Sequence, residues 1–254
     1  MLAEERRLTL LEWTISEGRV DAAEAAKRLD VAVETIRRDL DTLQRQGSLR
    51  RVHGGAITAR QRNRELNMPE RRVQNTESKL HIAELAASFL PDEGSVFVDG
   101  GTTTGFLVGA LKRKKNLIVI TNNVELAAQL GEAENEVYLV GGRIRKTTLT
   151  TLGSRAVEEF GMYRANIAFL GANGFSPTSG FTTTDPDESA VKKVMIANSL
   201  ERIVLADSAK MGAVYATAFA NTDVIDKLIT DSGISKSAVE AFTAAGVEVV
   251  TAQP

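Results

Sequence analysis

The stretch from Val33 to Ile57 reads VETIRRDLDTLQRQGSLRRVHGGAI, and it decides the fold of the N-terminal part of the chain. A helix is predicted first, because apolar residues recur at the spacing of one helical face: Val33, Ile36, Leu40 and Leu43. The residues after it, SLRRVHGGAI, predict a short strand, a tight turn at Gly54 and the start of a returning strand. We therefore expect a helix followed by a β-hairpin.

Two further helices are predicted upstream of this stretch. Over residues 4–17, apolar side chains recur at helical spacing: Leu8, Leu11 and Ile15. Asp21 then stands where an N-cap is expected, ahead of AAEAAKRL, whose alanines allow close packing. Three short helices followed by a basic hairpin predict a winged helix-turn-helix, the third helix of which enters the major groove of DNA.

Basic residues concentrate in the same part of the chain. The net charge of the protein is −2, yet residues 37–72 hold ten Lys and Arg against four Asp and Glu. Such a patch attracts a polyanion, although charge alone does not separate nucleic acid from an ordinary solvated basic surface. An ordinary helical bundle would have no need of arginines on both the third helix and the hairpin. We predict DNA contacts from these side chains: Arg37, Arg38, Arg50, Arg51 and His53.

From His81 onward, short apolar strands alternate with helices. Strand-like runs include SVFV (95–98), LIVI (117–120) and IAFL (167–170). This alternation predicts an α/β domain with a mostly parallel sheet covered on both faces. The residues before it are rich in charge and amide side chains, lack sustained periodicity and predict a linker. We expect a winged helix-turn-helix domain at 1–57, a linker at 58–79 and an α/β domain at 80–254.

The residues that follow the apolar strands are the candidates for a ligand site, because ligands of parallel sheets gather beyond the carboxyl ends of the strands. After SVFV comes DGGTTT, at a helix start, where glycines let backbone N–H groups approach an anion and threonines add donors. Taken singly, such residues often only turn the chain or cap the next helix. Together they predict a site for a small phosphorylated polyol. The candidates are Asp99, Gly100, Gly101, Thr102, Thr103, Thr104, Asn122, Asn123, Arg143, Asn173, Asp207 and Lys210.

The segment FTTTDPDESAVKK (181–193) predicts another helix start. Asp187 and Glu188 would lie near that start and Lys192 within the first turns. The alternative is a plain capped helix with a solvated lysine. We add Glu188 and Lys192 to the candidates.

Several function classes are excluded by what the sequence lacks. Without cysteine there is no disulfide, thiolate nucleophile or cysteine-ligated metal, and two histidines, His53 and His81, leave little for a metal site. The motifs of nucleotide hydrolysis, esterases, metalloproteases and dinucleotide enzymes are missing, so we predict no catalytic residue, no metal and no cofactor. No apolar run approaches the roughly 18 residues that span a bilayer. The start, MLAEERRLTL, is charged where a signal peptide would be apolar, so we expect a cytoplasmic protein.

Two groups of motifs resemble the DeoR-type family of bacterial repressors. ERRLTLLEWTISEGRV (5–20) and TIRRDLDTLQRQGSLRRVHGGA (35–56) resemble its DNA-binding head. DGGTTT, ITNN, VYLVGGRIR, FLGANGF and LADSAKMG resemble its sensor domain, which is similar in fold to ribose-5-phosphate isomerase and coenzyme A transferases.

The resemblance implies a repressor of sugar-uptake and sugar-catabolism genes that leaves its operator when a sugar phosphate binds. Fructose 1-phosphate and fructose 6-phosphate are the first effectors to test. Thr35, Arg37 and Arg38 would read the operator, with Arg50, Arg51 and His53 as wing contacts. The effector site would be formed by Asp99, Gly101, Thr102, Thr103, Asn122, Arg143, Asn173, Asp207 and Lys210.

Two other functions stay open. One is a sugar-phosphate isomerase with a regulatory head, in which Asp207 and Lys210 would shuttle a proton. The other is a binding module without DNA activity. The basic winged helix has no use in either, which favours the repressor. We also expect at least a homodimer joined through the sensor domain, because two heads reach two half-sites about one helical turn apart.

Overall fold

The computed structural model describes residues 2–46, 48–52, 54–58 and 68–253. The chain divides into two compact units, Met1–Thr76 and Glu77–Pro254. Each unit has its own buried apolar core. None of the helices in the described ranges combines the length and the apolar character needed to cross a membrane.

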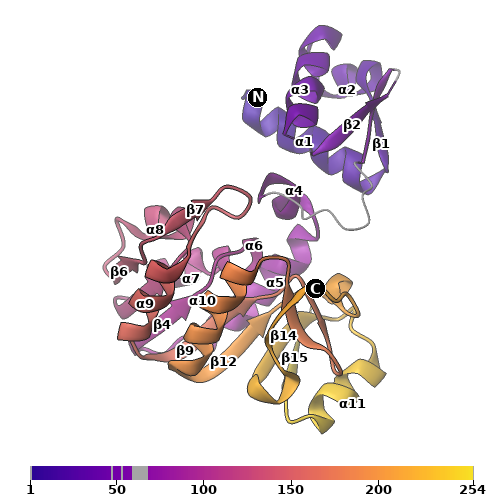
Figure 1. The fold of residues 1–254 in the computed structure, drawn as a ribbon. Coiled ribbons are helices and arrows are strands. Elements are labelled where there is room, and N and C mark those ends of the chain that lie inside the picture. Colours follow the sequence, from indigo (N-terminus) through magenta and orange to yellow (C-terminus); the bar gives the residue numbers. More distant parts are fainter. Residues whose placement is uncertain (1, 47, 53, 59–67, 254) are drawn as a thin grey trace. The chain divides into compact units, whose positions relative to one another are not determined.

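The first unit, which we call the head, has the element order of a winged helix (Figure 1). Its elements are α1 (Ala3–Ser16), β1 (Arg19–Asp21), α2 (Ala22–Leu29), α3 (Val33–Arg45), β2 (Leu49–Val52), β3 (Gly55–Thr58) and α4 (Met68–Val73). The strands form an antiparallel sheet in the order β1–β3–β2. The predicted winged helix-turn-helix is confirmed. The three-residue strand β1 was not predicted, because it is too short to show an alternating pattern.

The apolar spacing read from the sequence explains how the head packs. Ile36 and Leu40 of α3 are fully buried, and they meet Leu10 and Leu11 of α1 in one cluster. Asp21 caps α2 as predicted, since its carboxylate accepts the N–H groups of Ala23 at 2.9 Å and Glu24 at 3.0 Å. The three helices are therefore fixed by a small apolar core and one side-chain cap.

The segment expected to be a linker, 58–79, contains more regular structure than we predicted. It includes α4 and the first turn of α5 (Thr76–Ala87). Met68 and Glu70 are buried, and Val73 packs against the core of the head. A six-residue helix is too short to show a helical period among charged neighbours, which is why the pattern was missed.

The second unit is built on a seven-stranded parallel sheet, which confirms the predicted α/β architecture. In spatial order its strands are β15 (Glu248–Ala252), β14 (Lys227–Asp231), β12 (Ser199–Leu205), β9 (Ala165–Gly171), β4 (Glu93–Val98), β5 (Asn116–Thr121) and β6 (Glu136–Leu139). The chain runs outward from β4 to β6 and then returns to the other side of β4, where β9 begins the run to the opposite edge. The strand order thus reverses between β4 and β9. Such a switch point is where open parallel sheets bind ligands.

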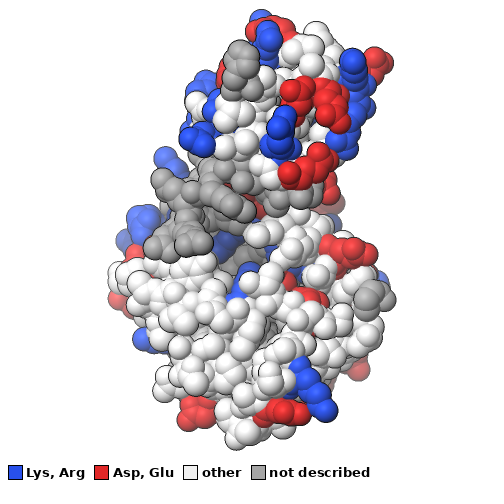
Figure 2. Space-filling view, turned by 90° about the vertical axis from the view of Figure 1, so that its right-hand side faces the viewer, with Lys and Arg blue, Asp and Glu red and all other residues white. Residues whose placement is uncertain are grey.

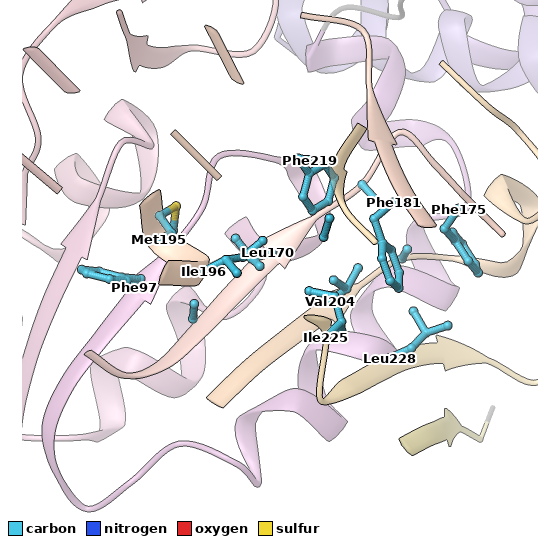
Figure 3. Close-up of a cluster of buried hydrophobic side chains, with 14 of the residues drawn as sticks. Phe97, Leu170, Phe175, Phe181, Met195, Ile196, Val204, Phe219, Ile225 and Leu228 are labelled. Atoms are coloured by element: carbon cyan, nitrogen blue, oxygen red, sulfur yellow. The ribbon is translucent and has the colours of Figure 1, made fainter. Parts of the chain in front are cut away.

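Helices cover both faces of this sheet. They are α5, α6 (Thr102–Gly105), α7 (Val108–Arg113), α8 (Val124–Leu130), α9 (Ser154–Met162), α10 (Pro186–Ala197) and α11 (Lys236–Ala244), with short turns at η1 (Ser208–Lys210) and η2 (Thr222–Val224). Because successive strand residues point to opposite faces, Phe97 joins the core beneath α9, α10 and α11, while Val96 joins the core beneath α5, α7 and α8. Figure 3 shows the first core, where the rings of Phe175 and Phe181 stack with centroids 6.1 Å apart.

Two small antiparallel sheets complete the second unit. One contains β10 (Gly174–Ser176), β11 (Gly180–Thr183) and β13 (Thr217–Ala220), and the other is the hairpin of β7 (Arg143–Arg145) and β8 (Thr150–Leu152). These strands are three or four residues long. They were not predicted, because strands of three or four residues are too short to show a clear apolar alternation.

Candidate DNA interface and ligand site

Helix α3 presents the predicted DNA-reading side chains to solvent. Its apolar face is buried, which leaves Arg37 and Arg38 exposed and Thr35 half-buried. Arg37 lies 3.4 Å from the carboxylate of Glu34, and both side chains are more than half exposed. An exposed pair of this kind contributes at most about 1 kcal/mol, so it would yield readily to a phosphate or a base edge.

A buried ion pair holds α3 against α1. Arg6 Nε lies 2.6 Å from Asp39 Oδ2, with side-chain exposures of 11% and 10%, and Arg7 Nε lies 3.9 Å from Asp39 Oδ1. Because a buried charge without a partner is costly, the pair fixes which face of α3 turns inward. Sequence reasoning missed it, since Asp39 stands in a polar run and its partner lies 33 positions away.

The two described arginines of the wing differ in their surroundings. Arg50 is exposed, whereas Arg51 is half-buried, lies 3.4 Å from Asp41 and donates its backbone N–H to the side chain of Gln44. His53, the third predicted wing residue, lies outside the described residues. On the face of the head seen in Figure 2, basic and acidic side chains are intermixed.

At the switch point of the second unit, Asp99 joins the ends of β4 and β9. Its backbone N–H donates to the carbonyl of Phe169 at 3.0 Å, and its Oδ2 accepts the N–H of Gly171 at 2.9 Å. Lys192 of α10 donates to the same carboxylate and to the carbonyl of Gly171, the latter at 2.9 Å. The side chains of Lys192 and Asp99 are 5% and 4% exposed. A buried ion pair therefore binds two strands and a helix together.

The glycine loop that follows Asp99 is held by neighbouring elements. The N–H of Gly100 donates to Oδ1 of Asn122, at the end of β5, over 2.9 Å. Gly100 also lies against β8, because a Cβ at this position would be 1.9 Å from the methyl group of Thr150. Any side chain at position 100 would displace the hairpin.

Helix α6, which begins in this loop, has four residues and buries the side chains of Thr102, Thr103 and Thr104. Within the described part of the chain, the backbone N–H groups of Gly101, Thr102 and Thr103 donate to no acceptor. Consecutive N–H groups of this kind can bind an anion. The structure thus offers backbone donors at the loop, whereas the buried threonine side chains belong to the packing around it.

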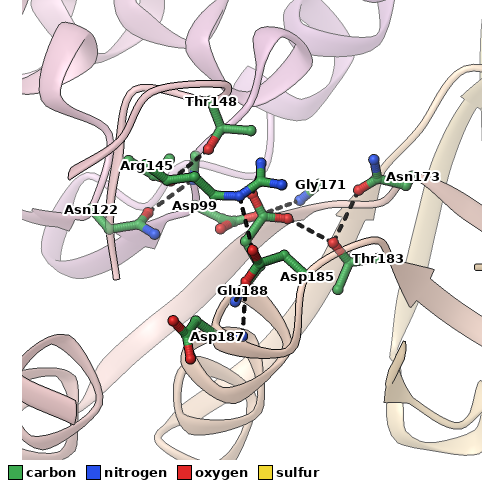
Figure 4. Close-up of polar contacts among 12 residues, drawn as sticks. Asp99, Asn122, Arg145, Thr148, Gly171, Asn173, Thr183, Asp185, Asp187 and Glu188 are labelled. Carbon is green, nitrogen blue, oxygen red and sulfur yellow. Dashed lines mark hydrogen bonds and ion pairs between the residues drawn. The ribbon is translucent and has the colours of Figure 1, made fainter. Parts of the chain in front are cut away.

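The first turn of α10 receives an arginine from the β7–β8 hairpin (Figure 4). Arg145 is 13% exposed; its Nε lies 3.0 Å from Asp185 Oδ2 and its Nη1 lies 3.3 Å from Glu188 Oε1. Asp185 also caps α10 by accepting the N–H groups of Asp187 and Glu188. Burial raises the pKa of Asp185, but hydrogen bonds from the Glu188 N–H, the Arg145 guanidinium and the Asp187 N–H outweigh burial and hold the pKa below its usual range.

Glu188 continues this network toward β9. Its Oε2 accepts the hydroxyl of Thr183 at 2.6 Å, and Thr183 Oγ1 lies 3.1 Å from the side-chain amide of Asn173. The Thr183 hydroxyl thus lies within hydrogen-bond distance of two acceptors, Glu188 Oε2 and Asn173 Oδ1, and its single proton serves one of them at a time. The hydroxyl oxygen of Thr184 is buried and has no hydrogen-bond partner among the described residues.

The remaining candidates have other surroundings. Arg143 is 63% exposed and lies 2.8 Å from Asp187, while Asn123 uses its side chain to cap α8. Asp207 is buried after β12, with Lys210 Nζ 3.4 Å from its carboxylate. No group of three or more His, Asp or Glu side chains suited to a metal ion occurs in the described ranges.

Sequence reasoning selected Arg143 and missed Arg145, the buried arginine of the same GGRIR motif. Residues two apart on a strand share a face, so the motif itself could have suggested both. Which of the two is buried depends on α10, which lies about 40 residues further along the chain.

A winged helix-turn-helix joined in one chain to an α/β domain with a polar switch point defines the class of DNA-binding transcriptional regulators. Residues 6–62 match the model of the DeoR-like helix-turn-helix domain, and residues 74–232 match that of the DeoR C terminal sensor domain. The chain belongs to the DeoR family, as its motifs predicted.

Full-length relatives agree with this assignment. The uncharacterized HTH-type transcriptional regulator FruR of Bacillus subtilis (strain 168) is 35% identical, over 91% of this chain and 92% of the relative. The lactose phosphotransferase system repressor of Lactococcus lactis subsp. lactis is 33% identical, over 94% of this chain and 95% of the relative. Ribose 5-phosphate isomerase A from Methanocaldococcus jannaschii is 19% identical, with a TM-score of 0.41 over 54% of this chain and 55% of that one. A likeness of that size carries no inference about function.

Proposed function

We propose that the protein represses genes of sugar uptake or catabolism and leaves its operator when a phosphorylated sugar binds at the switch point. The observation that carries this proposal is the meeting of two kinds of group at one sheet edge. Unpartnered backbone N–H groups at Gly101 to Thr103 suit a phosphate. Buried carboxylate and amide groups nearby suit hydroxyls. A relative named as repressor of a lactose phosphotransferase system supports a sugar-linked role.

The head would bind the operator through α3 and the wing. Arg37 and Arg38 are exposed on the helix that enters the major groove in this motif, with Thr35 beside them. Arginine pairs with guanine through two parallel hydrogen bonds, and such a pair discriminates against the wrong base. Arg50, Arg51 and His53 would contact the DNA backbone. We propose that the protein acts in the cytoplasm, where it would meet its operator.

The effector would lie along the carboxyl ends of β4, β5 and β9. The loop 100–104 would take the phosphate, and side chains around it would take the hydroxyls. We assign these residues to the site: Asp99, Gly100, Gly101, Thr102, Thr103, Thr104, Asn122, Asn173, Glu188, Lys192, Asp207 and Lys210. Asn123 and Arg143 would act from its margin, because the first caps α8 and the second is exposed. We propose that the site binds without catalysis.

The test is DNA binding in the presence of sugar esters. Fluorescence anisotropy would follow a labelled duplex that covers the region upstream of the gene and of its neighbours. Fructose 1-phosphate and fructose 6-phosphate are the first additions, with fructose and inorganic phosphate as matched controls. We expect one ester to release the DNA and both controls to leave it bound. Release by fructose alone, or by none of a wider panel of sugar phosphates, would contradict the proposal. Conversion of a bound ester to its isomer would show an enzyme instead.

We further propose that the protein works as at least a homodimer joined through its second unit. A single winged helix contacts one half-site, and two linked heads gain affinity because the second binding step becomes intramolecular. Light scattering at concentrations where the operator is bound tightly is the direct measurement. A monomer under those conditions would overturn this proposal.

A further inference from the structure

The β7–β8 hairpin lies against the glycine loop at the switch point, where Thr150 packs on Gly100. Hydrogen bonds hold its β8 side to neighbouring elements. Thr151 donates its N–H to the carbonyl of Asn122 at 2.9 Å, and its hydroxyl donates to the carbonyl of Val140 at 2.5 Å. Val124 donates its N–H to the carbonyl of Leu149 at 3.1 Å. These bonds tie the hairpin to the end of β5 and the start of α8.

The β7 side of the hairpin is attached through charges. Arg145 reaches the first turn of α10, where it meets Asp185 and Glu188 with little exposure to solvent. Figure 4 shows the guanidinium lying between the hairpin and these carboxylates. On the same helix, one turn further on, Lys192 binds Asp99. The hairpin and the end of β4 are therefore each joined to α10 by ion pairs, the hairpin through Arg145 and the end of β4 through Asp99.

Arg145 also sets the charge at this edge. Asp185 and Glu188 share its guanidinium, so without it two carboxylates in the first turn of α10 would lose the positive charge between them. Like charges in a partly buried place repel each other and repel an approaching anion. An anionic ligand would then meet a more negative site held by a looser hairpin.

We propose that Arg145 is the positioning residue of the ligand site: by joining the β7–β8 hairpin to Asp185 and Glu188, it holds the hairpin across the switch point and makes this acidic edge able to accept an anion. This proposal rests on the proposed function for the ligand, but the hairpin can be examined without any ligand. Arg143 provides a matched control. It lies two residues earlier on the same strand and contacts the same helix turn through Asp187, but it is exposed.

The experiment compares the full-length wild type with Arg145→Met, Arg145→Lys and Arg143→Met, each checked for folding by circular dichroism. Hydrogen–deuterium exchange without ligand would report on the amides of 143–152. We expect Arg145→Met to speed their exchange about tenfold or more, which corresponds to about 1.4 kcal/mol of lost protection. Arg145→Lys should fall between Arg145→Met and wild type, because lysine keeps the charge but not the planar fork. Arg143→Met should exchange like wild type, because an exposed pair contributes little. Equal exchange in Arg145→Met and wild type would overturn the proposal.

The second measurement is calorimetric binding of fructose 1-phosphate and fructose 6-phosphate. If the wild type binds either, Arg145→Met should bind it at least tenfold more weakly. Lys236→Met, which removes a 92% exposed charge outside the proposed site, should bind it within twofold of wild type. Full affinity in a folded Arg145→Met would overturn the proposal. If the wild type binds neither ester, the assignment of these effectors fails. The exchange data alone then decide whether Arg145 holds the hairpin.

Discussion

The ammonium of Lys192 and the carboxylate of Asp99 form a buried ion pair that joins α10 to the end of β4. Lys192→Met would leave the buried carboxylate of Asp99 without its ammonium partner. Breaking a buried pair costs about 3 to 5 kcal/mol, so we expect the free energy of unfolding to fall by that amount in a urea titration. Asp99→Asn/Lys192→Met removes both charges and should recover more than half of the loss. A loss below about 1 kcal/mol in Lys192→Met would mean that the pair is screened like a surface one.

Thr103→Asp tests the glycine loop as the place of the effector phosphate. A carboxylate beside the backbone N–H groups would occupy their donors and repel an anion. A ligand shifts an equilibrium only by its differential affinity for two states, so the variant should bind the operator normally and stay bound when sugar phosphate is added. Anisotropy with labelled operator measures both properties. Thr103→Asn, similar in shape but uncharged, is the control and should still respond. Normal release in Thr103→Asp would place the phosphate elsewhere.

Recognition by α3 is tested by removing its exposed arginines one at a time. A good bidentate base contact contributes about 1 to 3 kcal/mol, so Arg37→Ala or Arg38→Ala should weaken operator binding about tenfold or more where the lost contact is to a base. Arg50→Ala should weaken all sequences alike and reduce the salt dependence. Lys236→Ala removes one charge from a 92% exposed position in the other unit and should change neither. Unchanged affinity in both helix variants would remove α3 from the interface.

The protein should lose stability in acid, because aspartates that form ion pairs and hydrogen bonds in the folded state become protonated. Burial raises the pKa of Asp226, but the Arg202 side chain and backbone N–H, together with the charge of Lys227, outweigh burial and lower the pKa. Burial also raises the pKa of Asp185, but the backbone N–H groups of Glu188 and Asp187 and the guanidinium of Arg145 outweigh burial and lower it. A folded pKa below the unfolded value of about 3.9 gives stability that is complete above that value and is lost as the pH falls through the folded pKa.

We therefore expect the urea midpoint to be nearly constant from pH 7 to pH 5 and to fall once the pH passes below about 4. Asp226→Asn should be less stable at neutral pH and show a shallower loss in acid. A midpoint that rose on acidification would contradict this sign.

The seven strands of the large sheet could be predicted because each contains an apolar run, and in the central strand β4 this run is buried on both faces, as Phe97 and Val96 illustrate. The head could be predicted from helical spacing and the cap at Asp21. The β7–β8 hairpin could not, because its strands have three residues each and owe their place to contacts with Asn122 and α10 rather than to a pattern of their own.

The candidate site shows the same division. Asp99 and Asn122 follow predicted strands, so a rule about strand ends finds them. Arg145 and Asp39 form ion pairs with partners that lie 40 and 33 positions away in the sequence. Burial of a charged side chain is decided by tertiary packing, and a single sequence does not contain that information in any local period.

The reversal of strand order between β4 and β9 has a consequence for how the molecule is made. The strands β4 to β6 come from one continuous stretch, and so do β9 to β15, whereas the bond between Asp99 and Gly171 closes a loop of 72 residues. Contacts that close long loops form late, because the entropy of closure must be overcome first. We expect two half-sheets to assemble first and the seam between them to close afterwards, an order that pulse-labelling hydrogen exchange would detect. The nascent protein would then acquire its ligand site only in the last step of folding. A bound ligand would stabilise the pairing of β4 with β9, which joins the two half-sheets.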